Sequence, residues 1–313
     1  MVTPKHIVTE EEIYYFDLRG YLVVRGVLTD EEIKACNDAI DHHAELLAER
    51  PLGSQTRGSK ALSGGKAGRS ELWGILEWPD EYRKPFRKLL VHPVVVARLT
   101  AFCGKGFRLD HGPWLISGQK GTDGATLHGA GEPFSPGDWY HQQNGQIFCR
   151  AVTVTWQFTD APAGAGGFCI VPGSHKANEP RPPGLDTLED DTDLVVQPDM
   201  KAGDVVFFAE AATHGTLPWT ADHDRRSVLY KYVERAACRD VGRFFTPQQR
   251  YGDWVNELTP EQQAVLYGPG VHTAGVPLPY LESDGKKTWI SGERIGQDVR
   301  GGTVKRCERR NQP

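Results

Sequence analysis

A histidine and an arginine in the second half of the sequence have the spacing of a site for a keto acid. His214 follows the apolar run 205–208 after a short interval, and Arg225 comes eleven residues later. An imidazole can bind a metal ion, and the metal can take the keto and carboxylate oxygens at one end of the acid. A guanidinium forms paired hydrogen bonds to a carboxylate at the other end. The two residues therefore predict a metal-dependent site for a keto acid with a second carboxylate.

Motifs on both sides of His214 are specific as a group. They are Gly166-Gly167-Phe168, Pro172-Gly173-Ser174-His175-Lys176, Lys201-Ala202-Gly203-Asp204, His214-Gly215 and Arg225-Arg226-Ser227. From residue 20 to about residue 232 the chain closely resembles the phytanoyl-CoA dioxygenase family. The resemblance implies an Fe(II)- and 2-oxoglutarate-dependent enzyme that uses O2. It also implies a mainly β fold with flanking helices, a double-stranded β-helix or cupin-like jelly roll.

The resemblance assigns roles to the residues around this pair. His214 matches the family's second iron histidine, and Arg225 matches the clamp for the far carboxylate of 2-oxoglutarate. Thr216 is expected as a supporting hydroxyl, and Trp156 as a wall of the pocket. Arg226 is the alternative clamp if the register differs by one residue.

Two segments compete for the first iron histidine. The family's usual pattern is His-x-Asp, but this chain offers His128-Gly129-Ala130 or His141-Gln142-Gln143, and neither has the carboxylate. We favour His128, because it follows a turn in a context that resembles the family's strand end. His141 would then be a surface or supporting residue. A displaced carboxylate could complete the site, and the candidates are Glu132, Asp138 and Glu210.

Ala130 at the carboxylate position would change the chemistry. Its methyl group leaves a coordination position beside iron that chloride can fill, and His-x-Ala resembles the 2-oxoglutarate-dependent aliphatic halogenases. The resemblance then implies His128, Ala130 and His214 around iron, with chloride as a further cofactor and chlorine transferred to an unactivated carbon. Hydroxylation with a displaced carboxylate is the alternative. A catalytically inactive fold that binds a ligand is a third possibility.

Short strands are predicted to position these residues. Apolar runs separated by Gly/Pro turns predict strands at 114–117, 148–158, 167–171, 205–209 and 227–233, a spacing typical of a sandwich or jelly roll. A strand at 20–24 and helices from Thr29 to about Glu49 and over 71–105 are expected before them. We expect a single catalytic domain over residues 1–313, with a helical N-terminal region (1–105), a jelly-roll core of about 106–235 and a wrapping segment (236–313).

The segment 51–70 is rich in glycine and basic residues and could be a lid over an anionic substrate or a solvated surface loop. Its candidate substrate contacts are Arg57, Lys60, Lys66 and Arg69, with Trp139 as a candidate ring contact. An anionic natural product or a nucleotide would suit such a set, with the charge on Lys or Arg and a ring on an aromatic face.

Composition excludes several function classes. The chain has 36 Lys and Arg against 41 Asp and Glu, a net charge of −5, so it lacks the basic surplus of a protein that binds nucleic-acid polymers. No run approaches the roughly 18 apolar residues of a membrane span, and the N-terminus lacks the core of a secretory signal. Six cysteines without paired spacing favour a reducing compartment. We therefore expect a cytoplasmic protein whose partner is a small molecule; the sequence does not indicate an oligomeric state.

Overall fold

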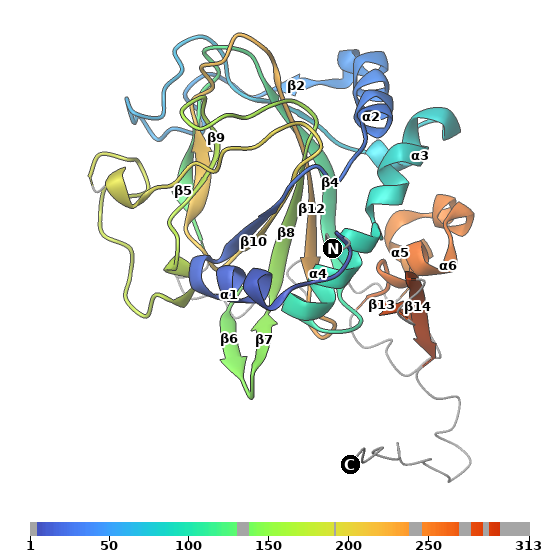
Figure 1. The fold of residues 1–313 in the computed structure, drawn as a ribbon. Coiled ribbons are helices and arrows are strands. Elements are labelled where there is room, and N and C mark those ends of the chain that lie inside the picture. The colour runs from blue at the N-terminus through green and yellow to red at the C-terminus, as the bar shows by residue number, and fades with distance from the viewer. Residues whose placement is uncertain are drawn as a thin grey trace.

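Two antiparallel β-sheets face each other and enclose the interior of the molecule (Figure 1). The structure is a computed structural model that describes residues 5–129, 138–190, 192–237, 246–268, 277–283 and 288–294. Within these residues the larger sheet has seven strands, in the order β1 (Tyr21–Val24), β10 (Val205–Ala209), β8 (Ala151–Gln157), β12 (Arg225–Val233), β4 (Arg108–Gly118), β3 (Ser70–Leu72) and β2 (Ala48–Glu49). The smaller sheet has the order β5 (Ala125–His128), β11 (His214–Leu217) and β9 (Gly167–Ile170). The predicted jelly roll is thus confirmed.

The central strands are buried on both faces. Every residue of β8 and of β10 is buried, which explains why β10 lacks the apolar–polar alternation of a half-exposed strand. Side chains still alternate between the two faces. On β8, Val154 and Trp156 point outward into the main core, while Thr153, Thr155 and Gln157 occupy the alternate positions that face the interior.

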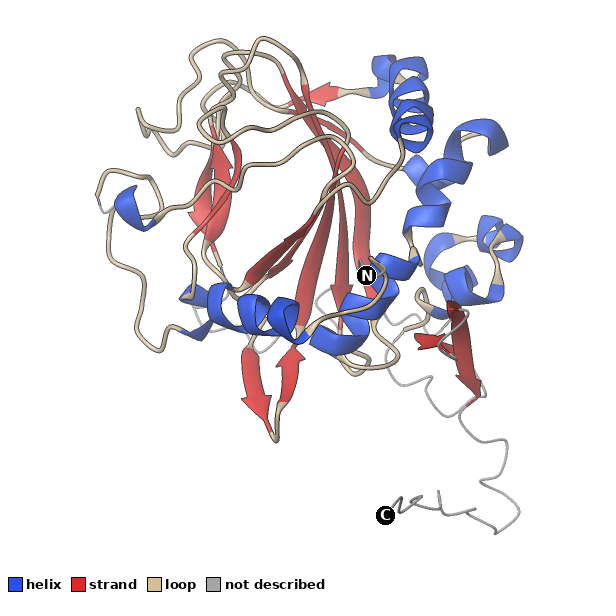
Figure 2. Ribbon diagram, viewed as in Figure 1, coloured by secondary structure: helices blue, strands red, loops and turns tan. Residues whose placement is uncertain are grey.

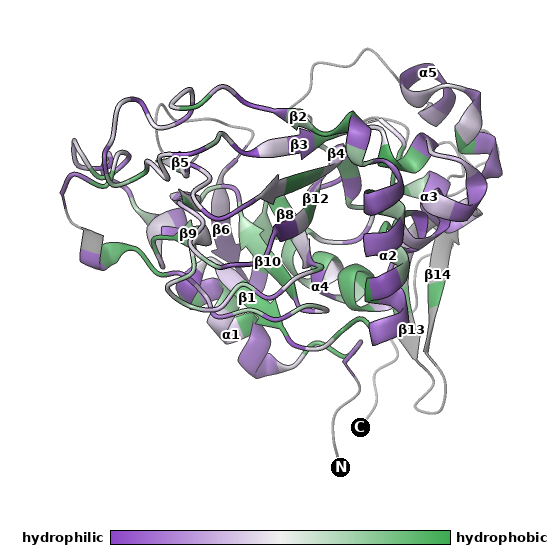
Figure 3. Ribbon diagram, turned by 90° about the horizontal axis from the view of Figure 1, so that it is seen from above, coloured by the Kyte–Doolittle hydropathy of each residue, from purple (hydrophilic) through white to green (hydrophobic). Residues whose placement is uncertain are grey.

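Three helices cover the outer face of the larger sheet (Figure 2). They are α2 (Asp30–His42), α3 (Asp80–Leu89) and α4 (Pro93–Cys103). Hydrophobic residues gather on α4 and on the central strands (Figure 3). The Tyr230 hydroxyl donates to the Phe86 carbonyl over 2.8 Å, so α3 is also fixed to β12 by a buried hydrogen bond.

The N-terminal region departs from the predicted helices. The capping box of Thr29 and Glu32 starts α2 as expected, but the helix ends at His42, before β2. Residues 70–72 form β3 instead of the start of a helix, because they pair with β4. Strands β1, β2 and β3 all join the larger sheet, so the jelly roll is not confined to residues 106–235.

The basic segment 51–69 is fixed in place by the Asp123 carboxylate. This buried group accepts hydrogen bonds from the backbone N–H of Gly53 at 2.7 Å and of Gly64 at 2.8 Å. A Cβ on Gly64 would lie 2.4 Å from the Gly121 carbonyl oxygen, so the backbone approaches too closely for any side chain there. The segment is therefore anchored at several backbone positions, and much of it is exposed at the surface.

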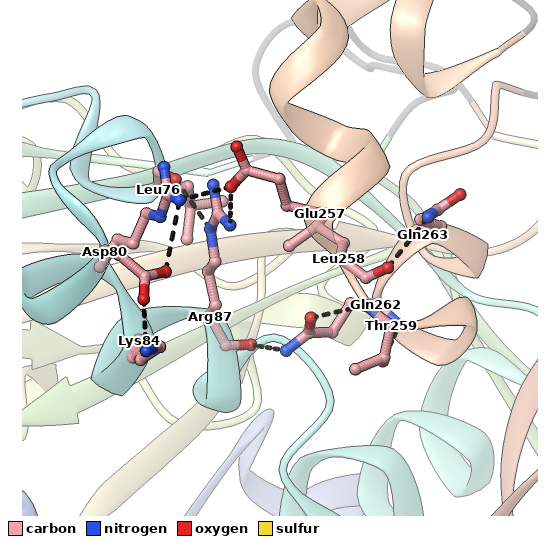
Figure 4. Close-up of polar contacts among 10 residues, drawn as sticks. Leu76, Asp80, Lys84, Arg87, Glu257, Leu258, Thr259, Gln262 and Gln263 are labelled. Atoms are coloured by element: carbon pink, nitrogen blue, oxygen red, sulfur yellow. Dashed lines mark hydrogen bonds and ion pairs between the residues drawn. The ribbon is translucent and has the colours of Figure 1, made fainter.

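The C-terminal region packs against the helices and away from the smaller sheet (Figure 1). It contains α5 (Pro247–Tyr251), α6 (Pro260–Ala264) and a hairpin of β13 (Pro277–Ser283) and β14 (Thr288–Arg294). In Figure 4, Arg87 of α3 contacts Glu257 at 2.9 Å, and Gln262 donates to the Arg87 carbonyl at 2.7 Å. No helix within the described ranges has the length and hydrophobicity needed to cross a membrane.

Candidate functional site

His128 and His214 lie side by side at one edge of the smaller sheet. His128 ends β5, His214 begins β11, and the antiparallel register places the two residues directly opposite each other. Their ring centroids are 4.4 Å apart, and His214 is only 5% exposed. The pairing of these two strands thus brings together two imidazoles that are 86 residues apart in the sequence.

Backbone carbonyls orient both imidazoles. The Nδ1 atom of His128 lies 3.2 Å from the Thr126 oxygen, and that of His214 lies 2.8 Å from the Ala212 oxygen. Since a carbonyl only accepts, Nδ1 carries the proton and the Nε2 lone pair is left for a metal ion. Burial lowers the pKa of His214 to about 3. His128 is exposed to solvent, but desolvation by the protein around its ring also lowers its pKa, so both rings are neutral at pH 7. Neutral imidazole is the form that binds metals.

A third protein ligand does not lie beside this pair in the described residues of the chain, where no group of three His, Cys, Asp or Glu side chains could hold a metal ion. Glu210 is buried nearby, but its carboxylate accepts from the Thr153 hydroxyl and from Lys231 at 2.8 Å. Asp138 is also buried, three residues before His141. Ala130 and Glu132 lie outside the described residues.

His141 is placed differently from His128. It belongs to a hairpin formed by β6 (Tyr140–Gln143) and β7 (Gln146–Cys149), which projects beyond the two sheets (Figure 1). Its ring stacks between those of Trp139 and Phe148, with distances between ring centroids of 4.3 Å and 4.7 Å. Of the two candidate first histidines, the structure brings His128, and not His141, next to His214.

Arg225 is a buried cation on the inner face of the larger sheet. It begins β12 and is 6% exposed. Among the described residues, no carboxylate or carbonyl accepts a hydrogen bond from its guanidinium. Burial, and then the positive charge of Arg69, lower its pKa to about 10, so the group is still charged at pH 7. A buried charge without a counterion is costly, and an anionic ligand would compensate it.

Arg69 adds positive charge at the same end of the interior. It precedes β3 and contacts the buried Glu71 carboxylate at 2.6 Å. Arg50 contacts the other oxygen of Glu71, also at 2.6 Å. Arg50 and Arg69 thus share the Glu71 carboxylate, while Arg225 has no acceptor among the described residues, so these four side chains together carry an excess of positive charge. Such a field attracts anions.

Polar side chains without partners line the path between the histidines and Arg225. The Thr155 hydroxyl and the Gln157 amide nitrogen are buried and have no hydrogen-bond partner among the residues that the structure describes. Thr216 lies two residues after His214 on the same face of β11 and is also buried. Buried donors without acceptors are rare in folded proteins and indicate a site for a polar ligand. A polar residue at every second position of the run 153–157 was the sequence signal for this wall.

Two predicted pocket residues face the wrong way. Trp156 lies in the main core on the outer face of β8, with its ring 5.4 Å from His92, so its assignment as a pocket wall is wrong. Arg226 points to α2, where it contacts Asp41 at 2.5 Å, and it cannot replace Arg225 as the clamp. Both corrections have one cause, because neighbouring residues of a strand point to opposite faces.

The predicted substrate residues are scattered. Arg57 is exposed and contacts Asp186 at 3.0 Å, while Lys60 and Lys66 are exposed on the outer side of the anchored segment. Trp139 lies in the β6–β7 hairpin. Only Arg69 of this set lies close enough to influence both Arg225 and His128 electrostatically.

Known proteins share this fold. HygX from Streptomyces hygroscopicus, solved with nickel, 2-oxoglutarate and hygromycin B bound, is 21% identical over 72% of this chain and 88% of its own, with a TM-score of 0.57. The epimerase SnoN, in complex with Fe3+, alpha ketoglutarate and nogalamycin RO, is 20% identical over 72% of this chain and 84% of its own, with a TM-score of 0.52. The carbocyclase SnoK from nogalamycin biosynthesis is 19% identical over 77% of this chain and 90% of its own, with a TM-score of 0.52.

A comparison by sequence assigns the family. No curated protein sequence matches this one significantly. The sequence model described as Phytanoyl-CoA dioxygenase (PhyH) matches residues 16–227, a range that contains His128, His214 and Arg225. The match covers most of the chain and agrees with the fold, and the chain therefore belongs to the phytanoyl-CoA dioxygenase family of Fe/2-oxoglutarate-dependent oxygenases.

Proposed function

We propose that His128 and His214 bind Fe(II) and that Arg225, supported by Thr216, binds the far carboxylate of 2-oxoglutarate. One observation carries the proposal: a buried guanidinium without an acceptor among the described residues occurs in the same jelly roll as two adjacent, neutral, oriented imidazoles, of which His214 is buried and His128 is exposed. The donors of Thr155 and Gln157 between them suit a polar ligand of this kind. The same features argue against a catalytically inactive fold, in which a buried charge would no longer serve a function.

Iron and 2-oxoglutarate, when bound, supply with O2 the oxidant that attacks an unactivated C–H bond. The chain orients these partners. The carbonyls of Thr126 and Ala212 hold the two imidazoles with Nε2 toward the metal position. The guanidinium of Arg225 fixes one end of the keto acid, which leaves the other end near the histidines. Arg69 adds a second positive charge that favours the dianion.

Radical halogenation, with chlorine transferred to carbon, is the reaction that we propose for the site. It is supported by Ala130 at the position of the family's carboxylate and by the lack, among the described residues, of a third His, Cys, Asp or Glu ligand beside the histidine pair. The alternative is hydroxylation, with Glu132 or another displaced carboxylate as the third ligand. The substrate is a small molecule, by analogy with the hygromycin B and nogalamycin RO bound by HygX and SnoN.

Chloride binding separates the two reactions. Fe(II) and 2-oxoglutarate are titrated anaerobically into the protein, and the charge-transfer absorbance is recorded with and without chloride. We expect a band that shifts with chloride in the natural protein and does not shift in Ala130→Asp. The His214→Ala variant is the control and should give no band.

Two results would contradict the proposal at different levels. A band indifferent to chloride would favour hydroxylation, and Glu132→Ala would then be expected to weaken iron binding. Absence of any band, with folding intact by circular dichroism, would refute the iron and 2-oxoglutarate site itself.

A further inference from the structure

Two tryptophans stack on the inner face of the larger sheet. Leu72 of β3 pairs with Leu115 of β4, so the next residue, Trp73, comes opposite Trp114. Their ring centroids are 4.9 Å apart and the ring planes differ by 11°. Trp114 is 7% exposed, whereas Trp73 is 51% exposed. The stack is thus buried at one end and open at the other.

Contacts connect this stack to the Glu210 carboxylate. The ammonium group of Lys231 lies 5.6 Å from the centre of the Trp114 ring, within the range of a cation–π interaction. The same ammonium contacts Glu210 at 2.8 Å, and the Thr153 hydroxyl donates to the other oxygen of this carboxylate. Trp114, Lys231 and Glu210 therefore form one cluster, in which the Lys231 ammonium contacts both the Trp114 ring and the Glu210 carboxylate.

The cluster continues to the candidate iron ligands. Phe208 pairs with Thr153 across β10 and β8, and its ring centroid is 4.6 Å from that of His214. Lys231 and Glu210 both influence the pKa values of His128 and His214. A molecule resting on Trp73 would therefore lie on the interior wall that leads to the histidines.

The charges beside the stack are already paired. Glu210 neutralises Lys231, and His111, whose ring lies 5.9 Å from that of Trp114, contacts Asp110 at 2.8 Å. Arg69 is paired with Glu71, two residues before Trp73, and Arg225, which has no acceptor among the described residues, lies opposite Gly118, four positions along β4 from Trp114, where 2-oxoglutarate is proposed to bind. The portion of a substrate that meets Trp73 is therefore selected for a flat, apolar face and not for negative charge.

We propose that Trp73 is a substrate-binding residue, and that a neutral ring of the substrate stacks on its exposed face and extends the Trp73–Trp114 pair. Tryptophan gives a large flat contact at a low cost in side-chain entropy. A planar heteroaromatic ring and the apolar face of a sugar share this chemistry. The inference rests on the proposed function only for the position of the metal.

Two probes distinguish the ring types. Adenosine serves as a neutral heteroaromatic ring and methyl β-D-glucopyranoside as a sugar, and their binding to the full chain is measured by saturation-transfer difference NMR. We expect at least one to bind the natural protein. Trp73→Ala should weaken that binding by roughly five- to a hundredfold, the range found for stacking on aromatic side chains. Trp73→Phe should retain most of it.

Tyr14→Ala is the matched control, since it also removes an exposed aromatic ring, 61% exposed, but on α1 (Glu10–Arg19). It should leave probe binding unchanged. Failure of both probes to bind, or equal binding to Trp73→Ala, would overturn the proposal. Conversion of a dimer to a monomer by Trp73→Ala, together with no probe binding, would instead assign this face to a second copy of the chain.

A further measurement with added Mn(II) separates this inference from the proposed function. Mn(II) is added in the presence of 2-oxoglutarate, and it should broaden the resonances of the bound probe, because a probe on Trp73 lies along the wall that reaches His214. If Mn(II) does not bind but the metal-free protein still binds the probe through Trp73, the iron site fails and the stacking site stands. If Mn(II) binds and the probe does not, the stacking site alone fails.

Discussion

Arg225 and Arg226 show that the orientation of a side chain decides whether it can bind a ligand in the interior. Both are arginines at the start of β12, yet the first faces the interior without an acceptor among the described residues and the second contacts Asp41 of α2. Their sequence surroundings are the same. Only the inward-facing guanidinium can meet 2-oxoglutarate.

Substitution of each arginine tests this difference. Arg225→Gln should weaken 2-oxoglutarate binding by roughly 30-fold or more, because removing one member of a buried, hydrogen-bonded charge pair typically costs 2–5 kcal/mol. Arg226→Gln should change it by less than about threefold, since Arg226 points away from the interior and contacts Asp41 of α2. Calorimetry of 2-oxoglutarate binding to the Mn(II)-loaded protein measures both. Equal losses in the two variants would contradict the assignment of Arg225 as the clamp.

His175 holds the segment after β9 against α1, a contact that the sequence motif does not reveal. His175 lies in a short helical turn, η3 (Ser174–Lys176), and its Nε2 lies 2.9 Å from the Asp17 carbonyl oxygen. Gly20, at the end of α1, has φ of +77°, and a Cβ there would lie 2.5 Å from His175 Nδ1. The motif Pro-Gly-Ser-His therefore serves to position a loop.

Gly20→Ala should destabilise the protein by about 2 kcal/mol or more, through the left-handed backbone and the clash with the imidazole. Gly53→Ala is the control, because Gly53 has nearly the same φ, +75°, and no atom within 4 Å of the added Cβ. It should cost only about 1 kcal/mol. Urea unfolding measures both changes. If the two variants lose the same free energy, the contact with His175 contributes nothing.

At the scale of the whole molecule, net charge and local charge have opposite signs. The chain carries a net charge of −5, but the interior end with Arg225, Arg69 and Arg50 is positive. The composition therefore excludes a polyanion as a partner without excluding a small dianion. The C-terminal region stabilises the far side of the sheet through Arg87 and does not reach this interior end in the described residues.

The stability of the whole molecule should fall on mild acidification, in part through His175. Burial lowers the pKa of His175 from 6.5 to about 4, so the unfolded chain binds more protons than the folded protein between these values. The free energy of unfolding therefore decreases as the pH falls from 6.5 to 4, by about 3 kcal/mol from this group. His175→Gln should lose that portion of the slope. Urea unfolding of the metal-free protein at several pH values gives the comparison, and identical slopes would contradict it.

The family, the jelly roll and the local signals of the site could all be predicted from the amino-acid sequence. The eleven-residue interval from His214 to Arg225 spans two strands that are consecutive in the chain, β11 and the start of β12, and the loop between them, so it can be recognised as a local sequence pattern. The capping box at Thr29 and the strand at 205–209 are likewise local, and the structure confirms them.

Which residues meet, and which face each one takes, depends on tertiary contacts that no local pattern contains. His128 reaches His214, and Trp73 reaches Trp114, through pairing between strands that are distant in the sequence or separated by a loop. Trp156 was misassigned because β8 is buried on both faces, so burial alone does not tell whether the side with Trp156 or the side with Thr155 and Gln157 lines the site. Alternation follows from the period of a strand, but the choice of the inward face depends on which elements cover it.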